Sequence, residues 1–413
     1  MKKIIVIGAG PAGMMAAIKA AENGAAVTLL EKMERIGKKL LITGKGRCNI
    51  TNIAENAEII KNIPGNGVFL NSALRAFNNE AVISFFNEIG VATKVERGGR
   101  VFPVSDKAAD VSAALLEKLL DLSVDVRTKM SVKSVELTNG KISGVTLADG
   151  TRLDAEAVVI STGGASYPKT GSTGDGYLFA RALGHTVVSP RPALVPLETE
   201  EEWVPEAMGL SLRNVQATLL IDGKKSAAEF GEMLFAHFGV TGPIILSLSR
   251  MAVQALAEKK LVEIELNLKP ALTPEKLSAR LVREFSSAPN KAVKNVMRQL
   301  LPEKLIAPVL DLAFIDGDQP VNQITKEERL RVVELLQHLL LTITKPRPVE
   351  EAIVTAGGVS TREINPKTME SKLVAGLYFA GEVIDVDGYT GGFNLQAAFS
   401  TGAAAGCWSA WND

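Results

Sequence analysis

Apolar and polar positions at the start of the chain predict a strand, a helix and a second strand. Residues 4–7 are continuously apolar and β-branched, a pattern typical of a strand covered on both faces in a parallel sheet. Glycines follow at once, and residues 14–22 then read as a helix rich in Ala and Met. Residues 26–30 form the next apolar run. The order strand, tight turn, helix and strand is that of a β-α-β unit.

Further strands are predicted later in the first half. Residues 124–147 read as a β-meander, with hairpin turns indicated by Asn139-Gly140 and by Asp149-Gly150. Residues 157–160 form another buried strand, which Ser161-Thr162-Gly163-Gly164 closes. A meander inserted between parallel strands and followed by such a glycine pair is a layout associated with FAD-binding flavoproteins of the two-dinucleotide-fold type.

Proline pairs at 190 and 192 and at 346 and 348 border a middle region that is long enough for its own core. Residues 214–221 and 261–268 read as strands within it. A helix is predicted to start at Pro274, because Pro suits the first turn and apolar residues then recur every four positions. Helical patterns continue to about residue 341, so we expect a β-rich domain that carries a helical insertion.

The first turn of the chain carries a nucleotide-binding fingerprint. Gly8-Ala9-Gly10-Pro11-Ala12-Gly13 matches G-x-G-x-x-G, in which Gly8 permits the turn, Gly10 lets the backbone approach a pyrophosphate and Gly13 lets the helix pack closely. Glu31 ends the second strand, where an acid is expected to accept a hydrogen bond from a ribose hydroxyl. A glycine turn without a ligand is the alternative, and the fingerprint alone does not separate FAD from NAD.

Composition narrows the possible chemistry. The 413 residues contain 46 Lys and Arg against 46 Asp and Glu, so no overall positive field would attract nucleic acid or an anionic membrane. Cys48 and Cys407 cannot form a CxxC redox pair, and the three histidines stand singly, which disfavours a metal centre. We therefore expect a cytoplasmic, compact protein whose chemistry comes from a bound organic cofactor.

A loop at residues 36–52 combines glycines with cations. Such a segment can lay its backbone against a flat ring system while a cation faces phosphate or a reduced, anionic cofactor. The alternative is a solvated basic loop. Within it, Cys48 is either a small buried apolar residue or a thiol whose pKa the neighbouring Arg47 lowers.

Residues 376–402 read as a strand, a loop and a helix that begins near Phe393 and contains Gly402. Gly381 lets the backbone approach a ligand, and Gly391-Gly392 open the helix, whose N-terminus would favour the negative charge of reduced flavin. A glycine-rich loop before a core helix is the alternative. Although residues 388–412 carry no charge, they lack the continuous apolar content of a membrane span, and we expect a buried helix packed through Gly and Ala.

Together these motifs resemble the aminoacetone oxidase-like family of FAD-dependent oxidoreductases, which is also called BaiN-like or YhiN-like. Its most specific matches here are residues 8–13 with Glu31, 44–49, 237–243 and 381–396. The resemblance implies an α/β fold: a Rossmann-type FAD-binding domain, split in sequence, with an inserted β-rich domain that carries a helical subdomain. The implied parts are 1–190 (FAD-binding), 191–273 (β-rich), 274–341 (helical) and 342–413, which returns to the β-rich domain and completes the FAD-binding one.

The resemblance also implies a set of FAD contacts, in which Val132 stands for the strand backbone that meets the adenine. The implied contacts are Gly8, Gly10, Ala12, Gly13, Glu31, Lys32, Lys38, Lys39, Gly46, Arg47, Val132, Thr162, Gly163, Gly381, Glu382, Gly392, Asn394 and Leu395. No metal ligand and no catalytic side chain is assigned. His237 could act as an acid or base, or it could stabilise a turn. The role of Tyr389 is likewise not assigned.

These observations predict an FAD-dependent oxidoreductase that acts on a small organic amine, alcohol or alkene at the flavin face, between the FAD domain and the insert. NAD(P)H or oxygen is its expected redox partner. Residues 171–176 have the wrong glycine order for a second dinucleotide unit, so NAD(P)H would dock only transiently.

Two other functions are compatible with the sequence. An NAD-dependent dehydrogenase would use the same fingerprint but needs neither the meander nor the C-terminal glycine helix. A non-enzymatic FAD-binding protein with an RNA or protein partner would use a local basic patch, for which Lys291, Lys294 and Arg298 on one helix face are candidates. Neutral net charge disfavours nucleic acid, no membrane partner is expected, and the oligomeric state is not predicted.

Overall fold

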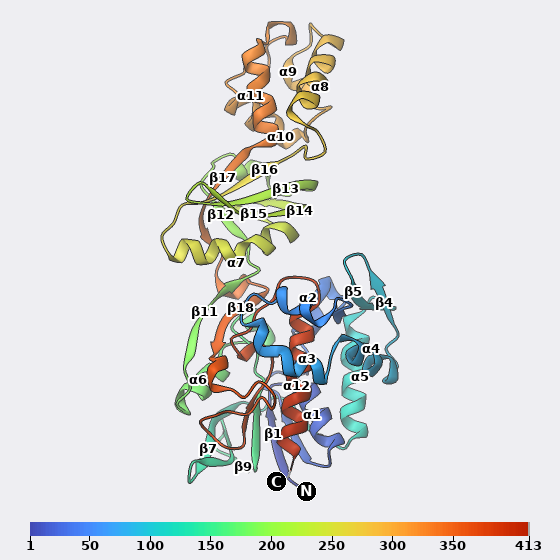
Figure 1. Ribbon diagram of the computed structural model, residues 1–413, viewed down its shortest axis with the longest axis vertical. Coiled ribbons are helices and arrows are strands. Elements are labelled where there is room, and N and C mark those ends of the chain that lie inside the picture. Colours follow the sequence, from blue (N-terminus) through green and yellow to red (C-terminus); the bar gives the residue numbers. More distant parts are fainter. Residues whose placement is uncertain (412–413) are drawn as a thin grey trace. The chain divides into compact units, whose positions relative to one another are not determined.

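The structure is a computed structural model that describes residues 1–411, and its chain folds into two compact units (Figure 1). Unit 1 combines the two ends of the sequence, Met1–Pro192 and Val349–Asp413, and unit 2 is the continuous segment Ala193–Pro348. The chain passes from one unit to the other at Pro192 and at Pro348. The α/β fold class predicted from the sequence is confirmed.

A five-stranded parallel sheet forms the centre of unit 1. Its order is β19 (Leu377–Phe379), β10 (Ala157–Ile160), β1 (Lys3–Ile7), β2 (Ala26–Leu30) and β6 (Asp125–Arg127). In β1, Ile4 is paired with Val27 on one side and with Ala157 on the other. Every residue of β10 and of β19 is buried. For β10 this confirms the prediction of a buried strand from its continuous apolar run.

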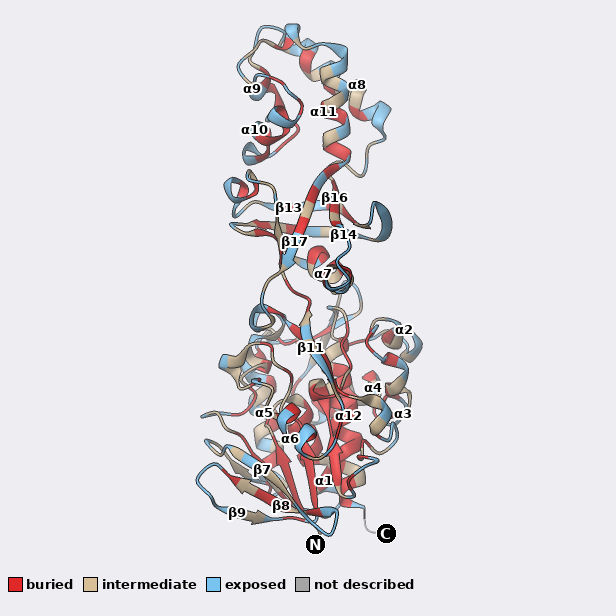
Figure 2. Ribbon diagram, turned by 90° about the vertical axis from the view of Figure 1, so that its left-hand side faces the viewer, coloured by how far each residue is buried: buried red, intermediate tan, exposed pale blue. Residues whose placement is uncertain are grey.

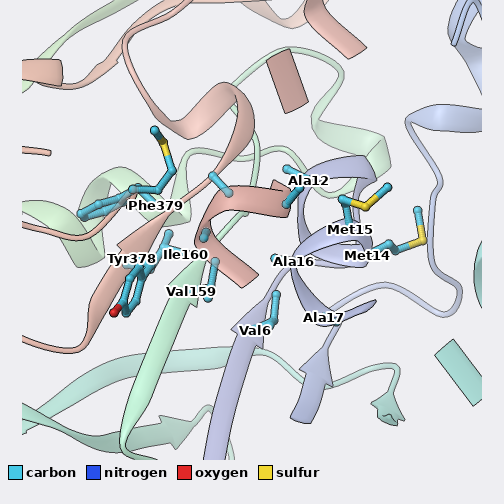
Figure 3. Packing of buried hydrophobic residues seen from close by; sticks show 14 of the residues in the cluster. Val6, Ala12, Met14, Met15, Ala16, Ala17, Val159, Ile160, Tyr378 and Phe379 are labelled. Carbon is cyan, nitrogen blue, oxygen red and sulfur yellow. The ribbon is translucent and has the colours of Figure 1, made fainter. Parts of the chain in front are cut away.

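Two helices from opposite ends of the sequence pack against each other on this sheet. Helix α1 (Pro11–Glu22) follows β1, and α12 (Phe393–Ala410) is the last helix described. A Cβ atom at Gly402 would lie 2.3 Å from the carbonyl oxygen of Ala12, and one at Gly406 would lie 2.2 Å from that of Ala16. The two backbones can approach this closely only because both positions are glycine. Figure 3 shows Ala12 and Ala16 in this core beside Val6 and Val159.

The predicted meander forms, but it is shorter than the sequence suggested. Its strands are β7 (Val132–Thr138), β8 (Lys141–Leu147) and β9 (Arg152–Asp154), and Asn139 and Gly140 both have positive φ, as a type I′ hairpin turn requires. The expectation that it starts at residue 124 is wrong, because β6 instead pairs with β2 at the edge of the parallel sheet. Figure 2 shows the buried strands of that sheet between the meander and helices α1 and α12.

Smaller elements complete unit 1. A three-stranded antiparallel sheet, here called the small sheet, has the order β3, β5, β4, and β11 pairs with β18. The remaining strands and α-helices are β3 (Thr51–Asn52), β4 (Thr93–Glu96), β5 (Arg100–Pro103), β11 (Val187–Ala193), β18 (Val354–Val359), α2 (Asn56–Lys61), α3 (Asn71–Ala76), α4 (Asn79–Glu88), α5 (Ala108–Asp121) and α6 (Asp175–Ala182).

Unit 2 is built on a closed antiparallel barrel. Around the barrel the strands are β12 (Leu197–Thr199), β15 (Gly239–Thr241), β14 (Lys224–Ala236), β13 (Ser211–Ile221), β16 (Val262–Asn267) and β17 (Leu339–Pro346), with α7 (Pro243–Ala257) packed against β14. Val262, Ile264 and Leu266 are buried and alternate with partly exposed Glu263, Glu265 and Asn267, as expected for a strand with one covered face.

Four α-helices are inserted between β16 and β17: α8 (Pro274–Ser287), α9 (Val293–Met297), α10 (Glu303–Leu312) and α11 (Lys326–Gln337). The predicted start of α8 is confirmed, and Leu277, Leu281 and Phe285 are its buried residues. The expectation that helical structure runs to residue 341 is wrong, because Leu339 already begins β17. Within residues 1–411, no helix is both long and apolar enough to span a membrane.

Candidate functional site

The glycine fingerprint forms a tight turn between β1 and α1, and each glycine has a different environment. Gly8 has φ +99°, which favours glycine, and a Cβ at Gly13 would lie 1.9 Å from the carbonyl oxygen of Gly8. A Cβ at Gly10, in contrast, would meet no atom within 4 Å. Gly8 and Gly13 are therefore required by the fold, whereas Gly10 borders open space, as expected where a ligand passes over the backbone.

The N-terminus of α1 opens onto the same turn. Gly10 is its N-cap residue, no side chain caps it, and its first turn contains no acidic residue. The free N–H groups and the positive end of the helix dipole favour an anion at this position. Ala12, another predicted contact, lies in this first turn and also packs against α12.

Glu31 lies at the end of β2, beside the glycine turn. It is buried, with 9% of its surface exposed, and its two carboxylate oxygens accept hydrogen bonds from the N–H groups of Ala9 (2.9 Å) and Met33 (2.8 Å). Each oxygen retains a second lone pair that can accept from a hydroxyl. The Met130 N–H donates to the Glu31 carbonyl at 2.9 Å, which brings the start of β7 at Val132 close to the same acid.

The segment after β10 contributes Thr162 and Gly163. Among the described residues, the buried hydroxyl of Thr162 has no hydrogen-bond partner, and a Cβ at Gly176 would lie 2.2 Å from it. Gly163 has φ +74°. The loop continues to Gly171, where a Cβ would lie 3.6 Å from Glu31 Oε1. The segments after β2 and β10 thus meet at the carboxyl edge of the parallel sheet, where open α/β sheets bind their ligands.

The C-terminal glycine segment reaches the same edge. A Cβ at Gly381 would lie 2.7 Å from the Cβ of Ala12, and its N–H donates to the Thr401 hydroxyl at 2.9 Å. Gly392, with φ +100°, is the N-cap residue of α12, which has neither a capping side chain nor an acid in its first turn. The amide of Asn394 bonds both the N–H and the C=O of Gly388, so this predicted contact shapes the loop before the helix.

A partly buried polar cluster joins four segments of unit 1. Lys39 Nζ donates to Glu382 Oε2 at 2.7 Å and to the Ser166 hydroxyl at 2.6 Å. Glu382 Oε1 accepts from the Thr355 N–H at 2.8 Å and from the Ser166 hydroxyl at 3.1 Å. Both Lys39 and Glu382 are about one-fifth exposed. The structure thus brings two predicted contacts, separated by more than 300 residues, into direct contact.

Ser166 and Thr355 were not predicted. Thr355 had a sequence signal, because it is a polar residue in the otherwise apolar, fully buried strand β18. Ser166 lies in a loop of mixed polar residues, where nothing in the sequence distinguishes it.

The other predicted lysines have acidic partners. Lys32 donates to Asp175 Oδ2 at 2.6 Å, and Lys38 pairs with Glu34, four residues earlier in the chain, at 3.0 Å. Lys32 therefore ties the segment after β2 to the start of α6. Leu395 is partly buried against the apolar core, and Gly46 has φ +85° at the end of the loop that follows Lys39.

The structure decides the roles that the sequence left open for Arg47 and Cys48. Arg47 forms ion pairs with Glu96 and Asp106, two acids of the small sheet and its flank. Cys48 is fully buried, and burial raises the pKa of its thiol to about 12. The reading of Cys48 as a small buried residue is confirmed, and the reading of a thiol activated by Arg47 is wrong, because desolvation dominates and the guanidinium is engaged elsewhere.

Asp385, between Gly381 and Gly391, is a carboxyl that sequence reasoning did not single out. Burial, with a smaller contribution from Asp387, raises its pKa, while the hydrogen bond from the Asn66 amide (3.0 Å to Oδ2) and the charge of Arg191 oppose the rise. A carboxyl with a raised pKa holds its proton to higher pH than usual and suits proton transfer. Within residues 1–411, no group of three His, Cys, Asp or Glu side chains is arranged to hold a metal ion.

Two further candidates from the sequence, a histidine and a basic patch, are part of unit 2. His237 belongs to unit 2, in the turn between β14 and β15, where its ring packs edge-on against Phe238. The predicted basic patch does not form on one helix face, because α9 spans only Val293–Met297, and Lys294 pairs with Asp318 (2.5 Å) and Arg298 with Glu303 (2.9 Å).

The chain is similar over its whole length to known proteins. A family model described as "HI0933-like protein Rossmann domain" matches residues 2–408. The 3-dehydro-bile acid delta(4,6)-reductase of Clostridium scindens is 34% identical over 98% of each chain, and the ribosomal RNA dihydrouridine synthase of Haemophilus influenzae is 30% identical over 97% of this chain and 96% of its own.

Among solved structures, the 3-ketosteroid delta1-dehydrogenase from Sterolibacterium denitrificans covers 99% of this chain and 100% of its own, with a TM-score of 0.54 and 12% identity. That similarity concerns the fold. From the full-length family match and the two relatives, the chain belongs to the HI0933-like Rossmann family of oxidoreductases, as its sequence motifs had suggested.

Proposed function

We propose that unit 1 binds one FAD and that the chain uses it to reduce a carbon–carbon double bond of a small organic substrate, with NAD(P)H as the electron donor. The observation that carries the cofactor proposal is the contrast among the three fingerprint glycines. Gly8 and Gly13 are enclosed by backbone, whereas Gly10 leaves open space beneath the uncapped N-terminus of α1. This is the environment that a dinucleotide pyrophosphate requires.

The surrounding residues fit the rest of FAD. Glu31 can accept a hydrogen bond from a ribose hydroxyl, and an acid there disfavours a 2′-phosphate. The uncapped N-terminus of α12 offers a second site for negative charge, as reduced flavin carries. FAD would supply the atom that accepts and returns a hydride. Gly8, Gly10, Glu31, Thr162 and Gly381, all at the carboxyl edge of the sheet, are the contacts we propose first.

In this proposal the polar cluster fixes the segments that flank the cofactor. Because Lys39 gives two N–H groups to Glu382 and Ser166, it holds the segment after β2 against the segments after β10 and β19. Its third N–H is left to face phosphate or a negatively charged ring. The same contacts keep the Glu382 carboxylate in one orientation.

The direction of the reaction is proposed from the relatives. A delta(4,6)-reductase and a dihydrouridine synthase both have names that describe the addition of hydrogen across a carbon–carbon double bond. For this chain, the net reaction would consume one NAD(P)H and one proton, saturate one double bond and yield NAD(P)⁺. Oxidation of an amine or alcohol, with oxygen as the acceptor, is the main alternative for the same cofactor.

RNA as the substrate has support from the names of two relatives, the ribosomal RNA dihydrouridine synthases of Haemophilus influenzae and Escherichia coli, but less from the charges on this chain. Its formal net charge is zero, and two of the three basic residues predicted to contact RNA are paired with acids. A nucleic-acid contact depends mainly on unpaired cations that face phosphates. We therefore propose a small molecule and treat RNA as an outcome of the test.

The test starts with the absorption spectrum of the purified protein, followed by anaerobic titration with NADH and NADPH. Flavin bands that bleach, and that return when a conjugated enone is added without air, support the proposal. Bands that bleach only with amines or alcohols, and return with oxygen, refute the proposed direction of the reaction and support FAD as the cofactor. Protein that remains colourless after incubation with FAD and binds NAD refutes the cofactor proposal. If uridine-containing RNA reoxidises the reduced flavin and no small enone does, the substrate is RNA and not a small molecule.

A further inference from the structure

The loop from Leu40 to Asn49, which contains kinked 3-10 turns over Leu40–Gly46, has an unusual backbone. Lys45 has φ +59° and Cys48 has φ +63°, so two residues with a Cβ adopt the left-handed conformation that normally favours glycine. Gly44, which directly precedes Lys45, also has a positive φ, of +56°. Because such residues persist only where the surroundings hold them, the loop must be fixed by contacts outside itself.

Arg47 supplies those contacts. Its Nε donates to Asp106 Oδ1 at 2.8 Å, its Nη1 donates to Glu96 Oε2 at 3.2 Å, and its Nη2 donates to both carboxylates. The guanidinium also lies over the ring of Phe102, 4.1 Å from the centroid. Four of its five N–H donors are therefore engaged, and one of its planar faces is covered.

The partners of Arg47 all belong to the small sheet or its flank. Glu96 ends β4, Phe102 lies in β5, and Asp106 follows β5. A Cβ at Gly44 would lie 3.3 Å from the Phe102 ring, so this ring contacts the loop at two points. The small sheet thus supports the loop from one side.

The charges in this cluster balance. Lys94 Nζ donates to Asp106 Oδ2 at 2.6 Å, which gives two cations and two carboxylates. The hydrogen bond from Arg47 lowers the pKa of Glu96, and hydrogen bonds from Lys94 and Arg47 lower the pKa of Asp106, so both carboxyls remain ionised at neutral pH. Little net positive charge is left on Arg47 for a phosphate.

We propose that Arg47 is a positioning residue: its side chain fixes the 44–48 loop on the small sheet, and the loop presents its backbone, rather than the guanidinium, to the cofactor. This inference rests on the proposed FAD site. It assigns Glu96, Phe102 and Asp106 to the support of that site, and it separates Arg47 from the cations that would pair with phosphate directly.

The two roles of Arg47 make opposite predictions for its acidic partners. If Arg47 positions the loop, Arg47→Ala and the double variant Glu96→Gln/Asp106→Asn both lower FAD affinity, by about tenfold, because each releases the same loop. The triple variant is then no weaker than Arg47→Ala alone. If Arg47 contacts a phosphate, the double variant binds FAD as tightly as wild type or more tightly, because it frees the guanidinium.

The experiment measures FAD affinity by titration of the apo-protein at two salt concentrations, together with the visible circular dichroism and the midpoint potential of the bound flavin. We expect both variants to shift the dichroism and the potential in the same direction, Arg47→Lys to recover part of the affinity, and the salt dependence to stay as in wild type. The control is Arg152→Ala, which removes an exposed Arg–Asp154 pair elsewhere in unit 1 and should change nothing.

Opposite shifts in the two variants, or a salt dependence that flattens only in Arg47→Ala, overturn the inference while leaving the proposed function intact. Wild-type protein that binds no FAD refutes the proposed function instead, and this inference fails with it.

Discussion

Gly10→Ala separates a glycine that the ligand requires from a glycine that the fold requires. Gly10 has φ −80° and ψ −177°, which any residue adopts, and its added Cβ would have no neighbour within 4 Å. The variant should therefore fold. At Gly13 the same change places a Cβ 1.9 Å from the backbone oxygen of Gly8, so Gly13→Ala should not give a native unit 1.

The expected magnitudes for Gly10→Ala follow from two opposing effects on stability. Ala is a poorer N-cap than Gly, which costs about 0.5–1.5 kcal/mol, whereas the loss of freedom in the unfolded chain stabilises by about 0.4–1 kcal/mol. The two nearly cancel, and the melting temperature of the apo-protein should change by no more than about 3 °C. FAD should bind about 10- to 100-fold more weakly, because the methyl group displaces the pyrophosphate from one charge-assisted hydrogen bond worth about 1.5–3 kcal/mol.

The assay combines thermal unfolding of the apo-protein with FAD titration by quenching of flavin fluorescence. Gly317→Ala is the matched control, because Gly317 lies in unit 2 and its nearest atom to an added Cβ is 3.5 Å away. If Gly10→Ala keeps its stability and binds FAD within twofold of wild type, the pyrophosphate does not cross this turn and the argument from open space is refuted.

Three further predictions concern packing, pH and thiol reactivity. Gly402→Leu should destabilise unit 1 by several kcal/mol, because its Cβ would lie 2.3 Å from the Ala12 carbonyl oxygen, and urea unfolding that matches wild type would contradict this. Burial lowers the pKa of His185 from 6.5, so below pH 6.5 the unfolded chain takes up a proton that the folded chain does not, and stability should fall between pH 7 and 5.5. The variant His185→Gln should flatten that dependence in urea unfolding, and an unchanged slope would assign it to another group. Finally, Cys48 should resist alkylation at pH 8 in folded Cys407→Ser protein and react once urea unfolds it, since its thiol is buried with a pKa of about 12; rapid labelling of folded protein would show that the loop opens.

Local pattern was enough to predict the first β-α-β unit, because its strands and helix are set by neighbouring residues. Strand β2 has the predicted bounds, and helix α12 begins at the predicted Phe393. The pattern failed at β6, a three-residue strand whose place is decided by its distant partner β2, and at Leu339, where an apolar run after a helix continues as a barrel strand. Short apolar runs do not distinguish helix from strand by periodicity alone.

The candidate site was predictable where a motif carries its own geometry and not where partners meet through the fold. The glycine turn and Glu31 belong to one short segment, so their proximity follows from the β-α-β unit. The ion pair of Lys39 with Glu382 joins residues 343 positions apart, and no local pattern indicates it. For the same reason, the sequence indicated that Arg47 was a cation available to the cofactor. It did not indicate that two carboxylates and an aromatic ring already contact the Arg47 guanidinium.

Because α1 packs against α12, unit 1 can be completed only after unit 2 during synthesis on the ribosome. Unit 2 is one continuous segment and has all its strands once residue 348 has emerged. Unit 1 must wait, because β19 completes one edge of its sheet and α12 covers α1 through Gly402 and Gly406. The nascent β-α-β unit therefore exposes the apolar face of α1 until residues up to Ala410 have left the ribosome. During this interval the exposed apolar surface is the part of the chain that a chaperone would bind.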